Sequence, residues 1–145
     1  MFTYGEAGWA LTKSFEGLEL SAYQDRGGVW TIGYGHTGAD VRPGMTITED
    51  EANALLAKDL SDAVECVNQH VKAINQNQFD ALVDFTFNLG CEALLSSTLL
   101  RRVNDGDIAG AAAQFLRWDH VKGNVVPGLT RRRQAEAELF QREAA

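Results

Sequence analysis

Residues 15–25 and 30–36 mark the point where this chain changes from a helical to an extended pattern. Their sequences are Phe15-Glu16-Gly17-Leu18-Glu19-Leu20-Ser21-Ala22-Tyr23-Gln24-Asp25 and Trp30-Thr31-Ile32-Gly33-Tyr34-Gly35-His36. The apolar residues before Gly17 recur at helical spacing, whereas those after it alternate as in strands. A glycine at the junction is typical of the left-handed residue that ends a helix.

A first helix is expected from about Tyr4 to Glu16. Thr3 and Glu6 have the spacing of a capping box, in which each side chain binds the backbone N–H of the other residue. Glu16 then occupies the last turn, where the partial negative charge of the helix end disfavours a second negative charge. A carboxyl group that keeps its proton near neutral pH can act as a general acid.

A hairpin is expected next, with strands over Leu20–Gln24 and Val29–Tyr34. The turn between them, Asp25-Arg26-Gly27-Gly28, is rich in residues that tolerate positive φ. Alternation on the second strand puts Thr31 on the face opposite its bulky apolar residues. If that face lines a cleft, Asp25 and Thr31 could together hold a water molecule opposite Glu16.

These residues resemble the catalytic pattern of the phage-type lysozymes, the endolysins that cut bacterial peptidoglycan at the end of an infection. Glu16, Asp25 and Thr31 match that family's triad, and the resemblance extends over nearly the whole chain. The further matching stretches are Thr48–Ala52, Phe79–Leu82, Phe85–Gly90, Ser97–Arg101 and Gly128–Arg133.

The resemblance implies an α+β, mostly α, two-lobed fold in a single lysozyme-like domain over residues 1–145. A small β-sheet lobe is expected over about 1–47, a connecting helix over about 48–71 and a helical lobe over about 72–145, with a cleft between the lobes. Thr48 and Glu51 form a capping box at the start of the connecting helix. The later helices are expected at about 78–89, 97–103, 107–117 and 129–141.

The implied activity is hydrolysis of the β-1,4 bond between N-acetylmuramic acid and N-acetylglucosamine without a cofactor. We expect an inverting mechanism, because a hydroxyl such as that of Thr31 helps a base that activates water and is of no use to a nucleophile. A lytic transglycosylase would break the same bond without water and would need only a catalytic Glu. Asp25 and Thr31, a pair suited to positioning water, argue against it. A wall-binding or membrane-perturbing module without chemistry is the third alternative.

Four further residues have roles implied by the resemblance or left open by it. Phe87 and Asn88 match positions that line the cleft floor in relatives, although a core role for Phe87 is equally compatible with its sequence context. His36 matches a histidine that pairs with an acid on the long helix, which is Asp59 here. Such a pair would raise the pKa of His36 and serve structure rather than catalysis.

The charge and the apolar content of the chain limit the kinds of molecule that the protein is expected to bind. The net charge is −7, and the chain has no stretch apolar enough to span a membrane. Nucleic-acid binding and stable membrane insertion are therefore not expected. Positive charge gathers after Ser97, so Arg131–Arg133 either meet anionic wall polymers or form a solvated helix face. We expect a monomer that accumulates in the cytoplasm of the host bacterium, with peptidoglycan as its substrate and a phage holin for its release.

Cys66 and Cys91 are expected to be free, partly buried thiols, because two cysteines make no disulfide framework and cytoplasmic proteins keep thiols reduced. A bridge formed after export is the alternative. His70 and His120 share no metal-ligand spacing with a cysteine or a carboxylate in the sequence, so no metal site is expected.

Overall fold

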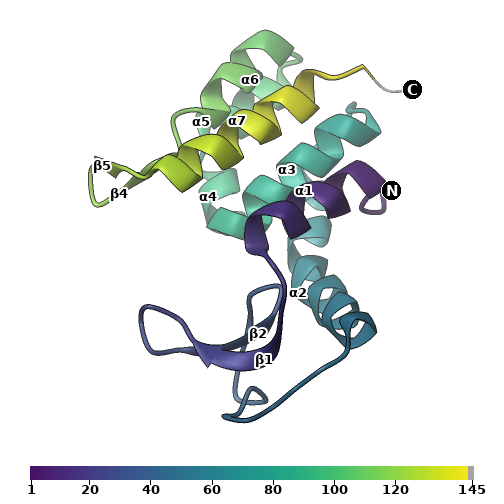
Figure 1. The fold of residues 1–145 in the computed structure, drawn as a ribbon. Helices are drawn as coiled ribbons and strands as arrows, with labels where there is room; N and C mark the ends of the chain where they lie inside the picture. The colour runs from purple at the N-terminus through teal and green to yellow at the C-terminus, as the bar shows by residue number, and fades with distance from the viewer. Residues whose placement is uncertain (144–145) are drawn as a thin grey trace. The chain divides into compact units, whose positions relative to one another are not determined.

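The computed structural model describes residues 1–143, and the chain divides into two compact units. One unit contains Met1–Leu11 and the chain from Asp62 onward, and the other contains Thr12–Ser61. Over the described residues the fold is mostly helical, with seven α-helices and five short strands (Figure 1). None of these helices combines the length and the hydropathy needed to cross a membrane.

The unit Thr12–Ser61 contains a three-stranded antiparallel sheet in the order β1-β2-β3, of which Figure 1 labels β1 and β2. Strands β1 (Glu19–Gln24) and β2 (Trp30–Gly33) form the expected hairpin. Strand β3 (His36–Thr37) was not anticipated, because it is two residues long and has no alternation to read. The chain reverses between β2 and β3 through Gly33 and Gly35, with φ values of 67° and 80°.

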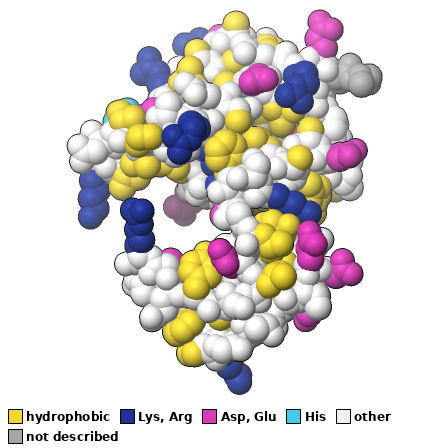
Figure 2. Space-filling model, in the orientation of Figure 1, with side chains coloured by type: hydrophobic (Ala, Val, Ile, Leu, Met, Phe, Trp, Pro, Cys, Tyr) yellow, Lys and Arg dark blue, Asp and Glu magenta, His cyan; other side chains and the backbone are white. Residues whose placement is uncertain are grey.

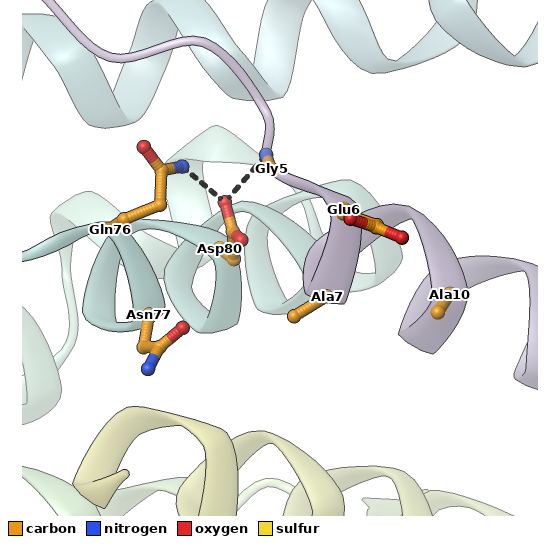
Figure 3. Close-up of a pocket in the computed structure, with 7 residues that line it drawn as sticks. All are labelled: Gly5, Glu6, Ala7, Ala10, Gln76, Asn77 and Asp80. Atoms are coloured by element: carbon orange, nitrogen blue, oxygen red, sulfur yellow. Dashed lines mark hydrogen bonds between the residues drawn. The ribbon is translucent and has the colours of Figure 1, made fainter. Parts of the chain in front are cut away.

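Helix α1 (Glu6–Glu16) begins two residues later than the sequence predicts. Its first turn is held by Asp80, whose carboxylate oxygens accept hydrogen bonds from the backbone N–H groups of Gly5 at 2.9 Å and Gly8 at 3.3 Å. Gln76 donates to the same carboxylate at 2.8 Å (Figure 3). Asp80 therefore caps the N-terminus of α1 in place of Thr3, because a carboxylate is favoured where a helix presents unpaired N–H groups.

Helix α2 (Glu49–His70) starts with the expected capping box. The Thr48 N–H donates to Oε1 of Glu51 at 3.0 Å, and the Glu51 N–H donates to the Thr48 hydroxyl at 3.1 Å. Both contacts are local in sequence, which is why spacing alone predicted them.

The other unit is built around five more helices: α3 (Gln76–Leu89), α4 (Cys91–Leu95), α5 (Thr98–Asn104), α6 (Ile108–Phe115) and α7 (Pro127–Gln141). Helices α3 and α7 run side by side in this unit, and α5 and α6 form a neighbouring pair (Figure 1). The core contains four fully buried phenylalanines: Phe79, Phe85, Phe115 and Phe140. Helix α4 was missed because five residues are too few to show helical spacing.

A hairpin of β4 (His120–Val121) and β5 (Asn124–Val125) precedes α7 and was also missed. Its two-residue turn has positive φ at both positions, 51° at Lys122 and 80° at Gly123, as tight hairpins require. Val121 and Val125 are exposed, and Figure 2 shows hydrophobic side chains gathered over this hairpin.

The expectation of two free thiols is wrong for this structure. Cys66, in the last part of α2, and Cys91, the first residue of α4, form a disulfide with their Cα atoms 6.1 Å apart. The pairing depends on how the chain turns back after α3, which the spacing of two cysteines does not contain. The bridge closes a loop with a sequence separation of 25 residues.

Two of the three consecutive arginines Arg131–Arg133 are buried. This corrects both expectations for the run, contact with anionic wall polymers and a solvated helix face. Arg132 makes a two-pronged contact with Asp84, from Nε at 2.9 Å and from Nη2 at 2.8 Å. Arg133 lies 2.7 Å from Glu136 and stacks over the Phe85 ring at 5.3 Å. Only Arg131 is exposed, so the run mainly joins α7 to α3 rather than presenting charge to solvent.

Candidate active site

Glu16 is the last residue of α1, as the sequence predicts, and its side chain is half-buried. Gly17 follows with φ 71°, and its N–H donates to the Lys13 carbonyl at 3.0 Å. This left-handed residue ends the helix and starts the sheet within two positions. Glu16 therefore sits on a fixed helix end within the same unit as the sheet.

Gly35 lies directly against the Glu16 carboxylate. A Cβ added to Gly35 would be 2.9 Å from Oε1 of Glu16 and 3.8 Å from its Cδ. Gly35 also has φ 80°, a backbone conformation that favours glycine. The turn after β2 thus brings bare backbone up to the carboxyl group.

Asp25 opens the turn between β1 and β2 and organises it. Its Oδ1 accepts hydrogen bonds from the N–H groups of Gly27 at 2.8 Å and Val29 at 2.9 Å. Its own N–H donates to the Val29 carbonyl at 2.9 Å. In the part of the chain that the structure describes, both hydrogen bonds accepted by this exposed carboxylate go to Oδ1, which leaves Oδ2 outside the turn.

Thr31 belongs to the central strand, where it is paired with Tyr23 of β1 and Thr37 of β3. It is only 4% exposed, and so is more enclosed than a residue at the edge of an open face. Its hydroxyl donates to the Val29 carbonyl at 3.0 Å. Because that bond uses the hydroxyl proton, the oxygen presents its lone pairs to any further partner.

Asp25 and Thr31 are therefore connected through one residue. Val29 gives its N–H to Asp25, and its carbonyl accepts from both the Asp25 N–H and the Thr31 hydroxyl. These bonds orient a carboxylate oxygen and a hydroxyl oxygen from the same hairpin. Two such acceptors can bind the two hydrogens of one water molecule.

His36 makes the contact with Asp59 that the resemblance implied. Its Nδ1 lies 2.7 Å from Oδ2 of Asp59 on α2, and its Nε2 lies 2.9 Å from Oδ2 of Asp40. Burial lowers the pKa of His36, but the hydrogen bonds with Asp59 and Asp40 outweigh it and raise the pKa above its ordinary value. Asp40 was not anticipated, and its contact with His36 lowers the pKa of the Asp40 carboxyl.

Phe87 and Asn88 lie near the end of α3, in the other unit, and both are half-buried. The Asn88 amide oxygen accepts a hydrogen bond from Nη2 of Arg133 at 2.8 Å. The fully buried aromatic residue on this helix turn is Phe85, which packs edge-on against Phe115 and Trp118. Of the two phenylalanines Phe85 and Phe87, it is therefore Phe85 that belongs to the core.

The family model described as phage lysozyme matches residues 13–136. That range includes Glu16, Asp25, Thr31 and most of the described fold.

The chain belongs to the phage lysozyme family.

It is therefore a lysozyme, a glycoside hydrolase of the endolysin type, and its mostly helical fold with a small antiparallel sheet is the lysozyme fold.

Two endolysins match this lysozyme over nearly their own whole length. The endolysin of Acyrthosiphon pisum secondary endosymbiont phage 1 is 44% identical over 94% of this chain and 96% of its own. The endolysin of Salmonella phage P22 is 39% identical over 97% and 99%. Among solved structures, the muramidase domain of SpmX from Asticaccaulis excentricus has a TM-score of 0.90 at 44% identity, covering 99% of this chain and 100% of that one.

Sequence reasoning missed two residues of this lysozyme that the structure places beside the site residues. Gly35 was quoted as part of a pattern, but nothing in the pattern said that it touches Glu16. Asp40, four residues after His36, carried no signal, because it stands in an irregular loop where no periodicity applies.

Proposed function

We propose that this lysozyme is an endolysin that hydrolyses the β-1,4 bond between N-acetylmuramic acid and N-acetylglucosamine with inversion at the anomeric carbon. Glu16 protonates the leaving oxygen. Asp25 removes a proton from a water molecule, and Thr31 fixes that water's second hydrogen bond. The observation that carries the proposal is the linkage of Asp25 and Thr31 through Val29.

The linkage favours a base over a nucleophile at Asp25. A nucleophilic carboxylate attacks the sugar itself and gains nothing from a neighbouring hydroxyl that binds water. A base that activates water gains orientation from such a hydroxyl, because the water then approaches in one direction. With Oδ1 held by the turn, Oδ2 of Asp25 is the oxygen that takes the proton.

Proton NMR of the first-formed product tests this assignment. Inversion of a β bond gives the α anomer, provided that spectra are taken before mutarotation equalises the two forms. A β product from the unmodified enzyme would overturn the roles proposed for Asp25 and Thr31.

Mass spectrometry of digested peptidoglycan separates this hydrolase from a lytic transglycosylase. Water as the attacking group leaves reducing ends, whereas attack by the substrate's own hydroxyl leaves anhydro ends. Anhydro products would show that Asp25 and Thr31 do not deliver water.

We also infer a monomer that accumulates in the host cytoplasm and reaches the wall through a holin lesion. The family resemblance supports this route. Lysis of cells that express the enzyme should then require a co-expressed holin, and lysis without one would contradict it. Sedimentation velocity of the purified enzyme tests the monomer directly.

A further inference from the structure

The cross-link between α2 and α4 has a third side chain beside it that the lysozyme reaction does not use. This side chain is His70, the last residue of α2. One of its ring nitrogens and the sulfurs of Cys66 and Cys91 all lie within 4.8 Å of one another. In the part of the chain that the structure describes, this is the one group of three or more His, Cys, Asp and Glu side chains that could hold a metal ion. No metal site was expected at His70 from the sequence spacing, but in space His70 lies close to both cysteines.

The His70 ring makes one hydrogen bond of the kind that metal-bound histidines make. Its Nδ1 lies 2.9 Å from the Cys66 carbonyl, to which it donates when it carries the ring proton. In that tautomer Nε2 keeps a free lone pair. Metal-bound histidines usually donate their other ring N–H in this way, which fixes both the tautomer and the ring orientation.

The backbone around the three side chains is held by other contacts. The His70 carbonyl accepts a hydrogen bond from Nδ2 of Asn104 at 3.1 Å, and Val71 donates to the Val67 carbonyl at 2.9 Å. The last turn of α2 therefore has backbone contacts that do not involve the disulfide. Its exposed carbonyl groups also carry the partial negative charge of a helix C-terminus, which favours a cation nearby.

We propose that the reduced enzyme binds one Zn²⁺ through Cys66, Cys91 and His70, with water in the fourth position. Two thiolates and one imidazole form a donor set that zinc accepts in tetrahedral sites that keep one open position. Sulfurs bound to one tetrahedral zinc lie about 3.8 Å apart, given Zn–S bonds of about 2.3 Å. Once the S–S bond is cut, side-chain rotation can supply that separation, because the Cα atoms are already 6.1 Å apart.

The chemistry balances in two steps. A phosphine reductant and one water molecule convert the disulfide to two thiols, and the phosphine leaves as its oxide. Zn²⁺ then displaces the two thiol protons, which pass to the buffer, while neutral His70 binds without losing a proton. Disulfide and zinc are thus alternative ways of joining the same two cysteines.

Titration of phosphine-reduced, metal-free enzyme with Zn²⁺ against a chromophoric chelator tests the proposal. One equivalent should bind with release of two protons, the latter measured calorimetrically in buffers of different ionisation enthalpy. The oxidised enzyme should bind no stoichiometric zinc. Equal binding by the reduced and oxidised forms would overturn the proposal.

Variants identify the ligands. We expect His70→Gln to weaken binding by at least about 10-fold and Cys91→Ser, which leaves one thiolate, to weaken the thiolate-to-metal absorption seen with Co²⁺. His120→Gln, on the β4–β5 hairpin, is the matched control and should bind as the unmodified enzyme does. If Cys91→Ser fails to fold, His70→Gln decides alone, because His70 is exposed, and unchanged binding there would refute the site.

Discussion

Gly35 and Glu16 approach each other so closely that a methyl group on Gly35 would lie 2.9 Å from Oε1 of the carboxylate. Carbon and oxygen atoms do not settle at that distance, so an added side chain must displace the carboxyl group. Since Glu16 is the proposed acid, small movements of this group should be visible in the rate.

We therefore expect Gly35→Ala to lower wall-clearing activity by 10-fold or more, on the order of the loss that small misplacements cause. Gly44→Ala is the matched control: Gly44 has φ 82°, close to the 80° of Gly35, but nothing lies within 4 Å of its added Cβ. Both variants should lose about 1 to 2 kcal/mol of stability from the positive φ. Equal activity in the two variants would show that the contact with Glu16 has no catalytic consequence.

Glu16→Gln should lower turbidity clearing of a wall suspension by about 10²-fold or more, because the amide keeps the shape but has no proton to give. Glu19→Gln, on the exposed strand β1, is the control and should remain active. Circular dichroism checks that both variants are folded. Retention of killing by folded Glu16→Gln would favour a module that acts without chemistry.

Thr31→Val keeps the branched shape of the side chain and removes its hydroxyl. We expect kcat to fall by about 10²-fold, the low end of the range for a group that assists proton transfer. Thr37→Val is the control, because Thr37 is the cross-strand partner of Thr31 and is exposed. A normal kcat in Thr31→Val would contradict the proposed role of the Thr31 hydroxyl in orienting the attacking water.

His36 should make stability depend on pH. Its pKa is raised in the folded enzyme, so its contribution is fully present below the ordinary histidine pKa and is lost as pH rises through the folded value. The pKa of Asp40 is lowered, so its contribution is present above the ordinary Asp pKa and is lost as pH falls through the folded value. Stability attributable to this contact should therefore peak between the two.

A double-mutant cycle with His36→Asn and Asp59→Asn measures the contact at 2.7 Å. We expect a coupling energy of about 0.5 to 3 kcal/mol at mildly acidic pH, and a smaller one at alkaline pH. Denaturant unfolding at several pH values gives both numbers. Additive effects of the two substitutions would mean that the two side chains do not support each other.

Asp84→Ala should destabilise the enzyme by about 3 to 5 kcal/mol, because it leaves the buried Arg132 guanidinium without its carboxylate. Glu138→Ala tests an exposed ion pair at the C-terminal end of α7, where Glu138 lies 3.8 Å from Arg142, and should cost less than about 1 kcal/mol. Denaturant unfolding compares the two. Similar losses would contradict the burial argument.

Most of the contacts between near neighbours that were predicted lie in regular turns and helix ends, whereas the contact of His36 with Asp40 in an irregular loop was not predicted. The capping box of Thr48 and Glu51, the end of α1 at Glu16 and the turn at Asp25 each depend on residues at most four positions apart. Local chemistry decides such features, so spacing reveals them. The β4–β5 turn belongs to this class as well, because Lys122-Gly123 is a local hairpin signal that the sequence prediction did not include.

Contacts between distant residues were not predictable from sequence spacing, and the contact of His36 with Asp59 was expected only from the family resemblance. Asp80 caps α1 from a sequence separation of 75 residues at Gly5, and Arg132 meets Asp84 across 48. Arginine is usually exposed, so three in succession suggested a surface. Only the packing of α7 on α3 supplies the buried carboxylate that reverses this preference.

The redox state of the pair Cys66–Cys91 reports the compartment in which the molecule resides. Disulfides persist in oxidising surroundings and are reduced in the bacterial cytosol. On the proposed route from the cytoplasm to the wall, a chain that has left the cell is therefore two hydrogen atoms lighter than one that has not. Intact-mass spectra taken through a lysing culture would therefore date the departure of each population of enzyme, with no label and no change to the sequence.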